Sequence, residues 1–125
     1  MRPFHKRLEQ TVEIIAEDGC RLRELIHPQR DAPSIDYSLA QAEIDPGQST
    51  LNHRLTEEDE LYYFVEGTGT MTIDDESFAV IAGDTVWVPR GVAQYVTNDG
   101  DLTLRWLNIV SPPWLLEHDQ RIERK

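Results

Sequence analysis

The sequence predicts an all-β domain, and two observations lead to that fold class. Short runs rich in Val, Ile, Thr, Tyr, Phe and Trp fill the middle of the chain, and several alternate polar with apolar residues, as half-buried strands do. Turn signals containing Gly, Pro, Asn or Asp separate these runs. Many short strands with regular turns are typical of an antiparallel sandwich or barrel. The expected strands are residues 38–44, 49–55, 60–66, 69–73, 78–81, 85–89, 94–97 and 102–110.

The two ends of the chain lack this regular pattern. Residues 8–16 fit either a strand or a short helix, whereas residues 21–26 are expected to form a strand. The charged tail over residues 115–124 is expected to form one or two helical turns or to fray. His5 and His118 lie in these ends, and we assign them no role.

Length and composition allow one hydrophobic core. The chain has 125 residues, of which 39% are hydrophobic and 28% charged, which is typical of a soluble globular domain that needs no disulfide to fold. We therefore expect a single domain over residues 1–125 with its core at about 37–110. Cys20 is the one cysteine, so no intrachain disulfide can form. No apolar run has the length of a signal peptide or a membrane span, so we expect a cytoplasmic protein.

Charge excludes two classes of partner. Twelve Lys and Arg against 23 Asp and Glu give a net charge of −11, whereas nucleic acids and anionic membranes require a positive surface. The three tryptophans, Trp87, Trp106 and Trp114, belong either to the core or to a subunit interface, and tryptophan enrichment at interfaces favours a homodimer.

Two spacing patterns in the middle of the chain carry the functional prediction. The first consists of Gly47, His53, Leu55, Glu60 and Gly67, and the second of Gly83, Pro89, Gly91, Gln94 and Asn98. They resemble the two motifs of the cupin superfamily, G-x5-H-x-H-x3,4-E-x6-G and G-x5-P-x-G-x2-H-x3-N. The resemblance implies a double-stranded β-helix, or jelly-roll, barrel with short extensions at both ends. It also implies a divalent metal inside the barrel, held by three His and one Glu.

Two of these four ligand positions hold other residues. Leu55 replaces the second His of the first motif, and Gln94 replaces the His of the second motif. Leucine cannot bind a metal, and a neutral amide oxygen is a weaker ligand than an imidazole. The resemblance therefore implies a site of His53, Glu60 and Gln94 that holds Mn, Fe or Zn weakly or not at all.

The strand pattern also predicts which residues line the cavity. Side chains two apart on a strand share a face, so the even-spaced neighbours of the motif residues point to the same side of the sheet. Most aromatic residues in such positions pack in a core, although some stack on a substrate. The expected cavity-lining residues are Leu55, Tyr62, Phe64 and Val96.

These observations leave two classes of function open. One is an enzyme that acts on a small oxygenated molecule, either with a metal as in dioxygenases, isomerases and lyases, or without one. In the metal-free case Glu60 and His53 are the catalytic acid and base of an isomerase or cyclase, and the apolar Leu55 favours a raised carboxylate pKa by desolvation. The other is a non-catalytic cupin that binds a small ligand or serves as a scaffold.

Overall fold

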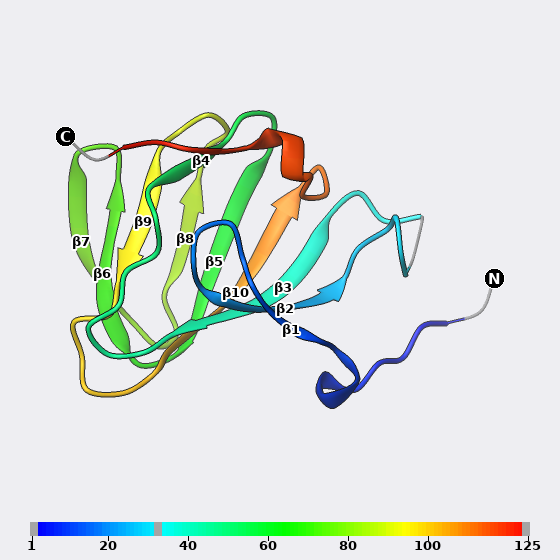
Figure 1. Cartoon of the computed structure of the whole chain (residues 1–125), viewed down its shortest axis with the longest axis horizontal. Coiled ribbons are helices and arrows are strands. Elements are labelled where there is room, and N and C mark those ends of the chain that lie inside the picture. Colours follow the sequence, from blue (N-terminus) through cyan, green and yellow to red (C-terminus); the bar gives the residue numbers. More distant parts are fainter. Residues whose placement is uncertain (1–2, 32–33, 124–125) are drawn as a thin grey trace.

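The structure is a computed structural model that describes residues 3–31 and 34–123, and these form a β-barrel (Figure 1). Its strands are β1 (Glu13–Ile15), β2 (Arg21–Ile26), β3 (Ser38–Ile44), β4 (His53–Leu55), β5 (Asp59–Glu66), β6 (Thr68–Ile73), β7 (Glu76–Ile81), β8 (Thr85–Val88), β9 (Gln94–Thr97), β10 (Leu104–Ser111) and β11 (Asp119–Arg121). Two 3₁₀ turns, η1 (Leu8–Gln10) and η2 (Leu116–His118), lie near the ends.

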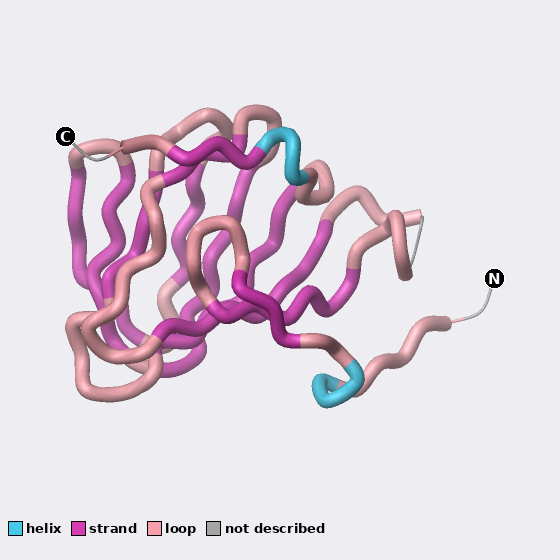
Figure 2. Tube along the Cα trace, in the orientation of Figure 1, coloured by secondary structure: helices cyan, strands magenta, loops and turns pink. Residues whose placement is uncertain are grey.

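The strands form two antiparallel sheets, which confirms the predicted jelly roll. The first sheet has the order β1-β2-β3-β10-β5-β8, and the second has the order β11-β4-β9-β6-β7. From β3 to β10 the chain crosses repeatedly between the sheets, and Figure 2 shows the loops that make these crossings at the two ends of the barrel. Segments far apart in sequence thereby become neighbours, which is how a barrel assembles one site from several strands.

The eight expected strands correspond to β3 to β10. The largest difference is at β4, which begins at His53 rather than at residue 49. Near the N-terminus, the region 8–16 contains both a helical turn and a strand, η1 and β1. At the other end the structure contains β11, a strand that the sequence analysis missed. Residue 124, the last of the tail that was expected to form helical turns or to fray, lies outside the described residues.

The core lies between the two sheets and centres on three aromatic rings. Tyr62, Phe64 and Trp106 are at most 1% exposed, and each pair of ring centroids is 5.9 Å apart. Such offset or tilted contacts stabilise a core beyond the area that they bury. Cys20, which is 1% exposed, extends this core toward the N-terminus, beyond the expected limit at residue 37. Trp87 differs from Trp106, because it is 59% exposed.

The turn between β5 and β6 depends on Gly67, the last residue of the first motif. Its φ is +86°, a left-handed conformation that favours glycine. A Cβ atom at this position would lie 2.4 Å from the backbone oxygen of Thr103, so only glycine lets the two segments approach so closely.

The last part of the chain crosses from one sheet to the other, and we call residues 114–121 the C-terminal strap. β11 pairs antiparallel with β4, so that Arg121 lies opposite His53 and Asp119 opposite Leu55. Figure 1 shows this segment, in red, beside β4. His118 Nδ1 lies 2.5 Å from an oxygen of the buried Glu58, which fastens the strap to the segment before β5.

Within the described ranges, no helix is long and apolar enough to cross a membrane.

Candidate functional site

A cavity of about 180 Å³ is lined by two of the three predicted site residues, His53 and Glu60. Its wall combines the β1–β2 hairpin, β3, β4, β5, β10 and the C-terminal strap. Pockets for drug-sized ligands are larger, at roughly 300–1,000 Å³, so this cavity suits a small molecule. Its wall includes the apolar side chains Ile14, Ile15, Leu22, Leu55, Val110 and Trp114.

His53 opens β4 and is only 5% exposed. Its Nδ1 lies 3.0 Å from the backbone oxygen of Leu51. A carbonyl oxygen only accepts hydrogen bonds, so Nδ1 carries the hydrogen and the Nε2 of the neutral ring has a free lone pair. No described residue forms a hydrogen bond with Nε2, which leaves this atom available to the cavity.

Glu60 lies near the start of β5 and is 7% exposed. Its Oε1 accepts a hydrogen bond of 2.8 Å from Nε2 of Gln94, and no described residue bonds to Oε2. Burial raises the pKa of Glu60 to about 7, and the charges of Asp18 and Asp119 act in the same direction, against the lowering effects of His53 and Gln94. The carboxyl group can therefore gain or lose a proton near neutral pH.

The pKa of His53 is raised above its ordinary value. Burial alone would lower this pKa, because it disfavours the imidazolium ion. The negative charges of Glu60, Asp18 and Asp119 outweigh that penalty, and the hydrogen bond to the Leu51 backbone adds to their effect. His53 and Glu60 thus form a coupled pair in which each titrates against the charge of the other.

Gln94 is the third predicted site residue, and it holds Glu60 by a hydrogen bond from outside the cavity. It lies opposite His53 in the register of β9 with β4 and is 1% exposed. Its amide NH₂ donates to Glu60, while its amide oxygen accepts the hydrogen bond of the Tyr62 hydroxyl. The structure thus brings His53, Glu60 and Gln94 together, but the Gln94 oxygen faces Tyr62 and not the cavity.

The predicted lining residues divide into two groups. Leu55 lies on the cavity wall beside His53. Tyr62, Phe64 and Val96 belong instead to the hydrophobic core, and they are not among the residues that line the cavity. The difference arises because the rings of Tyr62 and Phe64 stack with Trp106 and fill the space between the sheets. The cavity lies where the β1–β2 hairpin and the strap cover the barrel.

Sequence reasoning missed four acidic residues of the cavity wall, and the two whose charges act on both His53 and Glu60 are Asp119 from β11 and Asp18 from the β1–β2 turn. Asp119 accepts a hydrogen bond of 2.9 Å from the indole N–H of Trp114. Burial raises the pKa of Asp119, and the charge of Asp18 raises it further, against the opposite effect of His53. Asp18 is held in place by its backbone oxygen, which accepts a 2.7 Å hydrogen bond from Leu51.

Neither Asp18 nor Asp119 belongs to a motif. The dipeptide Asp18-Gly19 is a turn signal, which could have placed Asp18 between two strands but not above a cavity. Asp119 had no usable signal, because its strand depends on pairing with β4, far away in the sequence.

The donor set does not fit the divalent metal that the motif resemblance implied. Leu55 offers no donor atom, and the Gln94 oxygen is already bonded to Tyr62. His53 and Glu60 alone fall short of the three or four protein ligands of typical zinc sites. Among the described residues, no three His, Cys, Asp or Glu side chains are grouped so that they could hold a metal ion. We therefore derive no chemical step through a metal.

Comparisons with known proteins agree with this fold. Residues 40–110 match the family model described as the cupin domain. An uncharacterized protein of Methanocaldococcus jannaschii is 37% identical over 109 residues, which cover 87% of this chain and 86% of that protein.

Two similar solved structures come from bacteria. One is a Thermotoga maritima protein described as a predicted oxalate decarboxylase, with a TM-score of 0.75 and 21% identity, covering 85% of this chain and 96% of that chain. The other is Pac13 of Streptomyces, solved with uridine, with a TM-score of 0.78 and 15% identity, covering 98% of this chain and 92% of that chain. Pac13 is described as a nucleoside dehydratase. At these identities the likeness concerns the fold alone.

Proposed function

The chain belongs to the cupin family, and from that premise we propose that it is a metal-independent enzyme that transfers protons on a small molecule bound in the cavity. The reaction class is an isomerisation, a cyclisation or an elimination. One observation carries the proposal. His53 and Glu60 face the same small cavity, and each has one side-chain atom fixed by the protein and one left for a ligand.

The two side chains take complementary parts. Glu60, as a carboxylate, removes a proton from the substrate through Oε2. His53, as an imidazolium, donates a proton through Nε2 to the atom that gains negative charge or leaves. A catalytic acid and base work best when their pKa values lie near the operating pH. Burial, which raises the pKa of Glu60 to about 7, supports this assignment.

Gln94 and Tyr62 act as positioning residues. The Tyr62 hydroxyl donates to the Gln94 oxygen, which orients the amide so that its NH₂ donates to Glu60. The carboxylate thereby keeps one oxygen fixed and directs the other toward the cavity. A catalytic group that is held in place loses less entropy when the substrate binds.

A relative of the same fold gives limited support. Pac13 is described as a nucleoside dehydratase, so a barrel of this shape can house an elimination reaction. The proposal for this chain rests on its own residues and not on that likeness.

We further propose that the protein is cytoplasmic and forms a homodimer, as the sequence predicts.

The experiment uses solvent exchange, because this reaction reports proton transfer on any compound that enters the cavity. Wild-type protein is incubated in D₂O with pools of small metabolites, and NMR records which C–H groups gain deuterium. We expect the wild type to label one class of compound, and we expect Glu60→Gln and His53→Gln to slow this labelling by about 10²-fold or more. Glu57→Gln serves as the matched control, because Glu57 is exposed and lies outside the cavity.

Two results would overturn the proposal. Labelling that persists in Glu60→Gln would remove Glu60 from catalysis. A pool compound that binds without exchange or conversion would identify the protein as a non-catalytic binding cupin.

A further inference from the structure

The ionisable side chains of the cavity wall are mostly acidic. His53 is the one basic side chain among the described residues that line it, and no Lys or Arg contributes. The carboxylates come from four different segments and comprise Glu17, Asp18, Glu24, Glu60 and Asp119. Only the β1–β2 turn and β2 are neighbours in the sequence. The fold therefore brings these carboxylates together on one small cavity.

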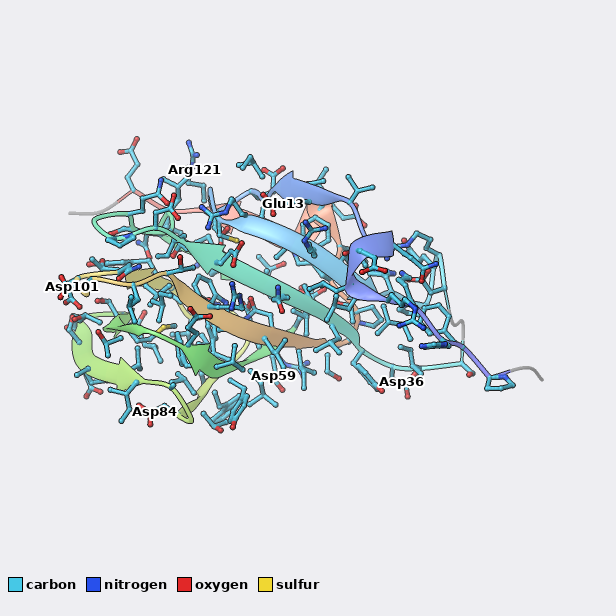
Figure 3. The ribbon with its side chains drawn as sticks, turned by 90° about the horizontal axis from the view of Figure 1, so that it is seen from below. Glu13, Asp36, Asp59, Asp84, Asp101 and Arg121 are labelled. Carbon is cyan, nitrogen blue, oxygen red and sulfur yellow. The ribbon has the colours of Figure 1, made fainter. Side chains whose placement is uncertain are left out.

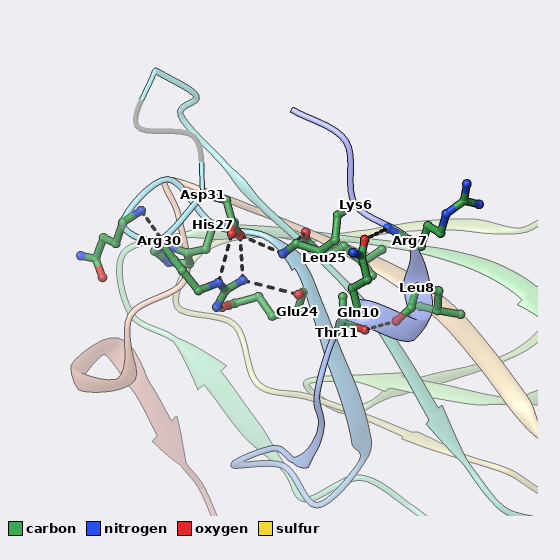
Figure 4. A network of polar contacts seen from close by, with 11 residues as sticks. Lys6, Arg7, Leu8, Gln10, Thr11, Glu24, Leu25, His27, Arg30 and Asp31 are labelled. Carbon is green, nitrogen blue, oxygen red and sulfur yellow. Dashed lines mark hydrogen bonds and ion pairs between the residues drawn. The ribbon is translucent and has the colours of Figure 1, made fainter. Parts of the chain in front are cut away.

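One of these carboxylates already has a cationic partner. Glu24 lies 2.7 Å from Nη1 of Arg30, and Arg30 also bonds to Asp31. Figure 4 shows this network, which continues to Lys6 and fastens the N-terminal segment to the turn after β2. The charge of Glu24 is therefore compensated from outside the cavity.

Asp18 and Asp119 have no such partner. Both accept hydrogen bonds from neutral donors: Asp18 from the backbone N–H of Cys20 at 3.2 Å and from the Cys20 thiol, and Asp119 from the indole of Trp114 at 2.9 Å. Neither forms an ion pair with a Lys or Arg among the described residues. The second carboxylate oxygen of Asp119 receives no hydrogen bond from the described residues, and the partners of Asp18 leave its negative charge uncompensated.

The available basic group does not neutralise both aspartates. His53 carries at most one positive charge, and among the surrounding carboxylates Glu60 interacts with that charge most strongly. When His53 and Glu60 compensate each other, Asp18 and Asp119 still leave the wall negative. Charges in a half-buried space interact more strongly than in bulk water, so a cationic ligand is attracted and an anionic one is repelled.

We propose that the cavity binds a small organic cation, an ammonium group on a short apolar chain, as the substrate class of the acid–base site, and this assignment rests on the function proposed above. The ammonium donates to the carboxylate groups of Asp18 and Asp119. The apolar chain packs against wall residues such as Leu22, Leu55 and Val110. Carboxylate and phosphate ligands are disfavoured, because the described residues of the wall include no Lys or Arg that would pair with them.

The test compares three probes of nearly equal shape and different charge: n-butylammonium, 1-butanol and butyrate. Calorimetry at physiological ionic strength measures their binding to the wild type, to Asp18→Asn and to Asp119→Asn. Both substitutions keep an oxygen that can accept the existing hydrogen bond, so the fold is expected to remain intact. Asp101→Asn is the matched control, since Asp101 is an exposed carboxylate outside the cavity wall.

We expect n-butylammonium to bind saturably, 1-butanol to bind more weakly and butyrate not to bind. Because a hydrogen bond to a charged group is lost, each aspartate variant weakens n-butylammonium by about tenfold or more, whereas Asp101→Asn does not. Butyrate that binds as tightly as n-butylammonium, the absence of any n-butylammonium binding, or unchanged affinity in both aspartate variants would overturn the assignment.

The test separates this inference from the proposed function. Solvent exchange that depends on Glu60 but occurs on a neutral or anionic compound would sustain the acid–base function and overturn the cation assignment. Selective n-butylammonium binding without exchange on any compound would sustain the cation site and overturn the acid–base function.

Discussion

At the scale of single residues, Glu60 is a carboxyl group that the fold holds largely away from water. Only 7% of its surface is accessible, and burial raises its pKa from 4.5 to about 7. A raised carboxyl pKa means that the folded protein disfavours the charged form. An ionised Glu60 therefore carries a cost in stability, and that cost is measurable.

We predict that Glu60→Gln is more stable than the wild type at pH 8. Between about pH 4.5 and pH 7 the unfolded wild type releases the Glu60 proton while the folded state retains it, so the free energy of unfolding falls as pH rises through this window. The glutamine variant lacks this loss, and its Oε1 still accepts the bond from Gln94. The gain is at most about 3 kcal/mol at pH 8, at about 1.4 kcal/mol per pKa unit, and it disappears below pH 4.5.

Urea denaturation at pH 4.5 and pH 8 measures this difference, and the exposed Glu57→Gln is the control. Equal stability of Glu60→Gln and wild type at pH 8 would show that Glu60 is not penalised by burial.

Tyr62 gives a second prediction at this scale. Its hydroxyl donates to the Gln94 oxygen, and both side chains are at most 1% exposed. Tyr62→Phe keeps the ring stacked on Phe64 and Trp106 but leaves the amide oxygen without its donor. We expect a loss of about 1–3 kcal/mol in the free energy of unfolding, which is the cost of an unsatisfied buried polar group. Unchanged stability in chemical denaturation would argue against this hydrogen bond.

At the scale of elements, the C-terminal strap completes the site. β11 places Asp119 at the cavity. Two backbone hydrogen bonds of 2.9 Å hold the strap beside β4: Thr56 N–H donates to the oxygen of His118 in the strap, and the N–H of Ile122, just after the strap, donates to the oxygen of Asn52. His118 pairs with Glu58, which is 2% exposed. Removal of His118 would leave this buried carboxylate without its cationic partner.

We therefore predict that His118→Ala loosens the strap in a pH-dependent way. The hydrogen bond to Glu58 raises the pKa of His118 in the folded state. The stabilisation is fully present below the ordinary histidine pKa of about 6.5 and is lost as pH rises through the higher folded value. His118→Ala should lower the melting temperature more at pH 6 than at pH 9, and it should accelerate amide exchange at Thr56 and Ile122. His5→Ala, at an exposed site, should do neither.

If the melting temperature of His118→Ala fell equally at both pH values, the ion pair with Glu58 would not be what fastens the strap.

The elements also show what the sequence could and could not predict. The alternation of polar and apolar residues in β5 and β10 reflects the side that faces the core, so their strands follow from local patterns. The motif spacing likewise predicted that the side chains of His53, Glu60 and Gln94 lie close together in the fold. β11 is different, because Asp119-Gln120-Arg121 has no strand propensity and is extended only through its pairing with β4. The cavity depends on this strap, so its full acidic wall could not be predicted from motifs.

At the scale of the whole molecule, the outer face of the six-stranded sheet is unusual for a chain with a net charge of −11. Across β3, β10, β5 and β8, two cross-strand rows contain no charged residue. One row comprises Leu39, Ile109, Leu61 and Trp87, and the other comprises Gln41, Leu107, Tyr63 and Thr85. In Figure 3 the labelled acidic residues lie around the rim of this view. Two copies can therefore meet at these rows without bringing carboxylates together.

We predict a homodimer through these rows. Sedimentation should give twice the mass of one chain for the wild type, and the mass of one chain for Trp87→Glu, because the new charge would be buried in the interface. Phe78→Glu is the matched control, since it adds a charge to an exposed aromatic position on β7, in the other sheet, and should remain dimeric. A monomeric wild type would contradict the dimer, and a dimeric Trp87→Glu would contradict this interface.

The central claim is that His53 and Glu60 form an acid–base pair and not the remains of a metal centre. The measurement that tests it most directly is the metal content of the purified protein after incubation with Mn²⁺, Fe²⁺ or Zn²⁺ and dialysis, for the wild type and for His53→Ala. Because Leu55 offers no donor and the Gln94 oxygen is bonded to Tyr62, we predict that neither protein retains a stoichiometric metal. One equivalent of metal that is retained by the wild type and lost in His53→Ala would contradict the claim.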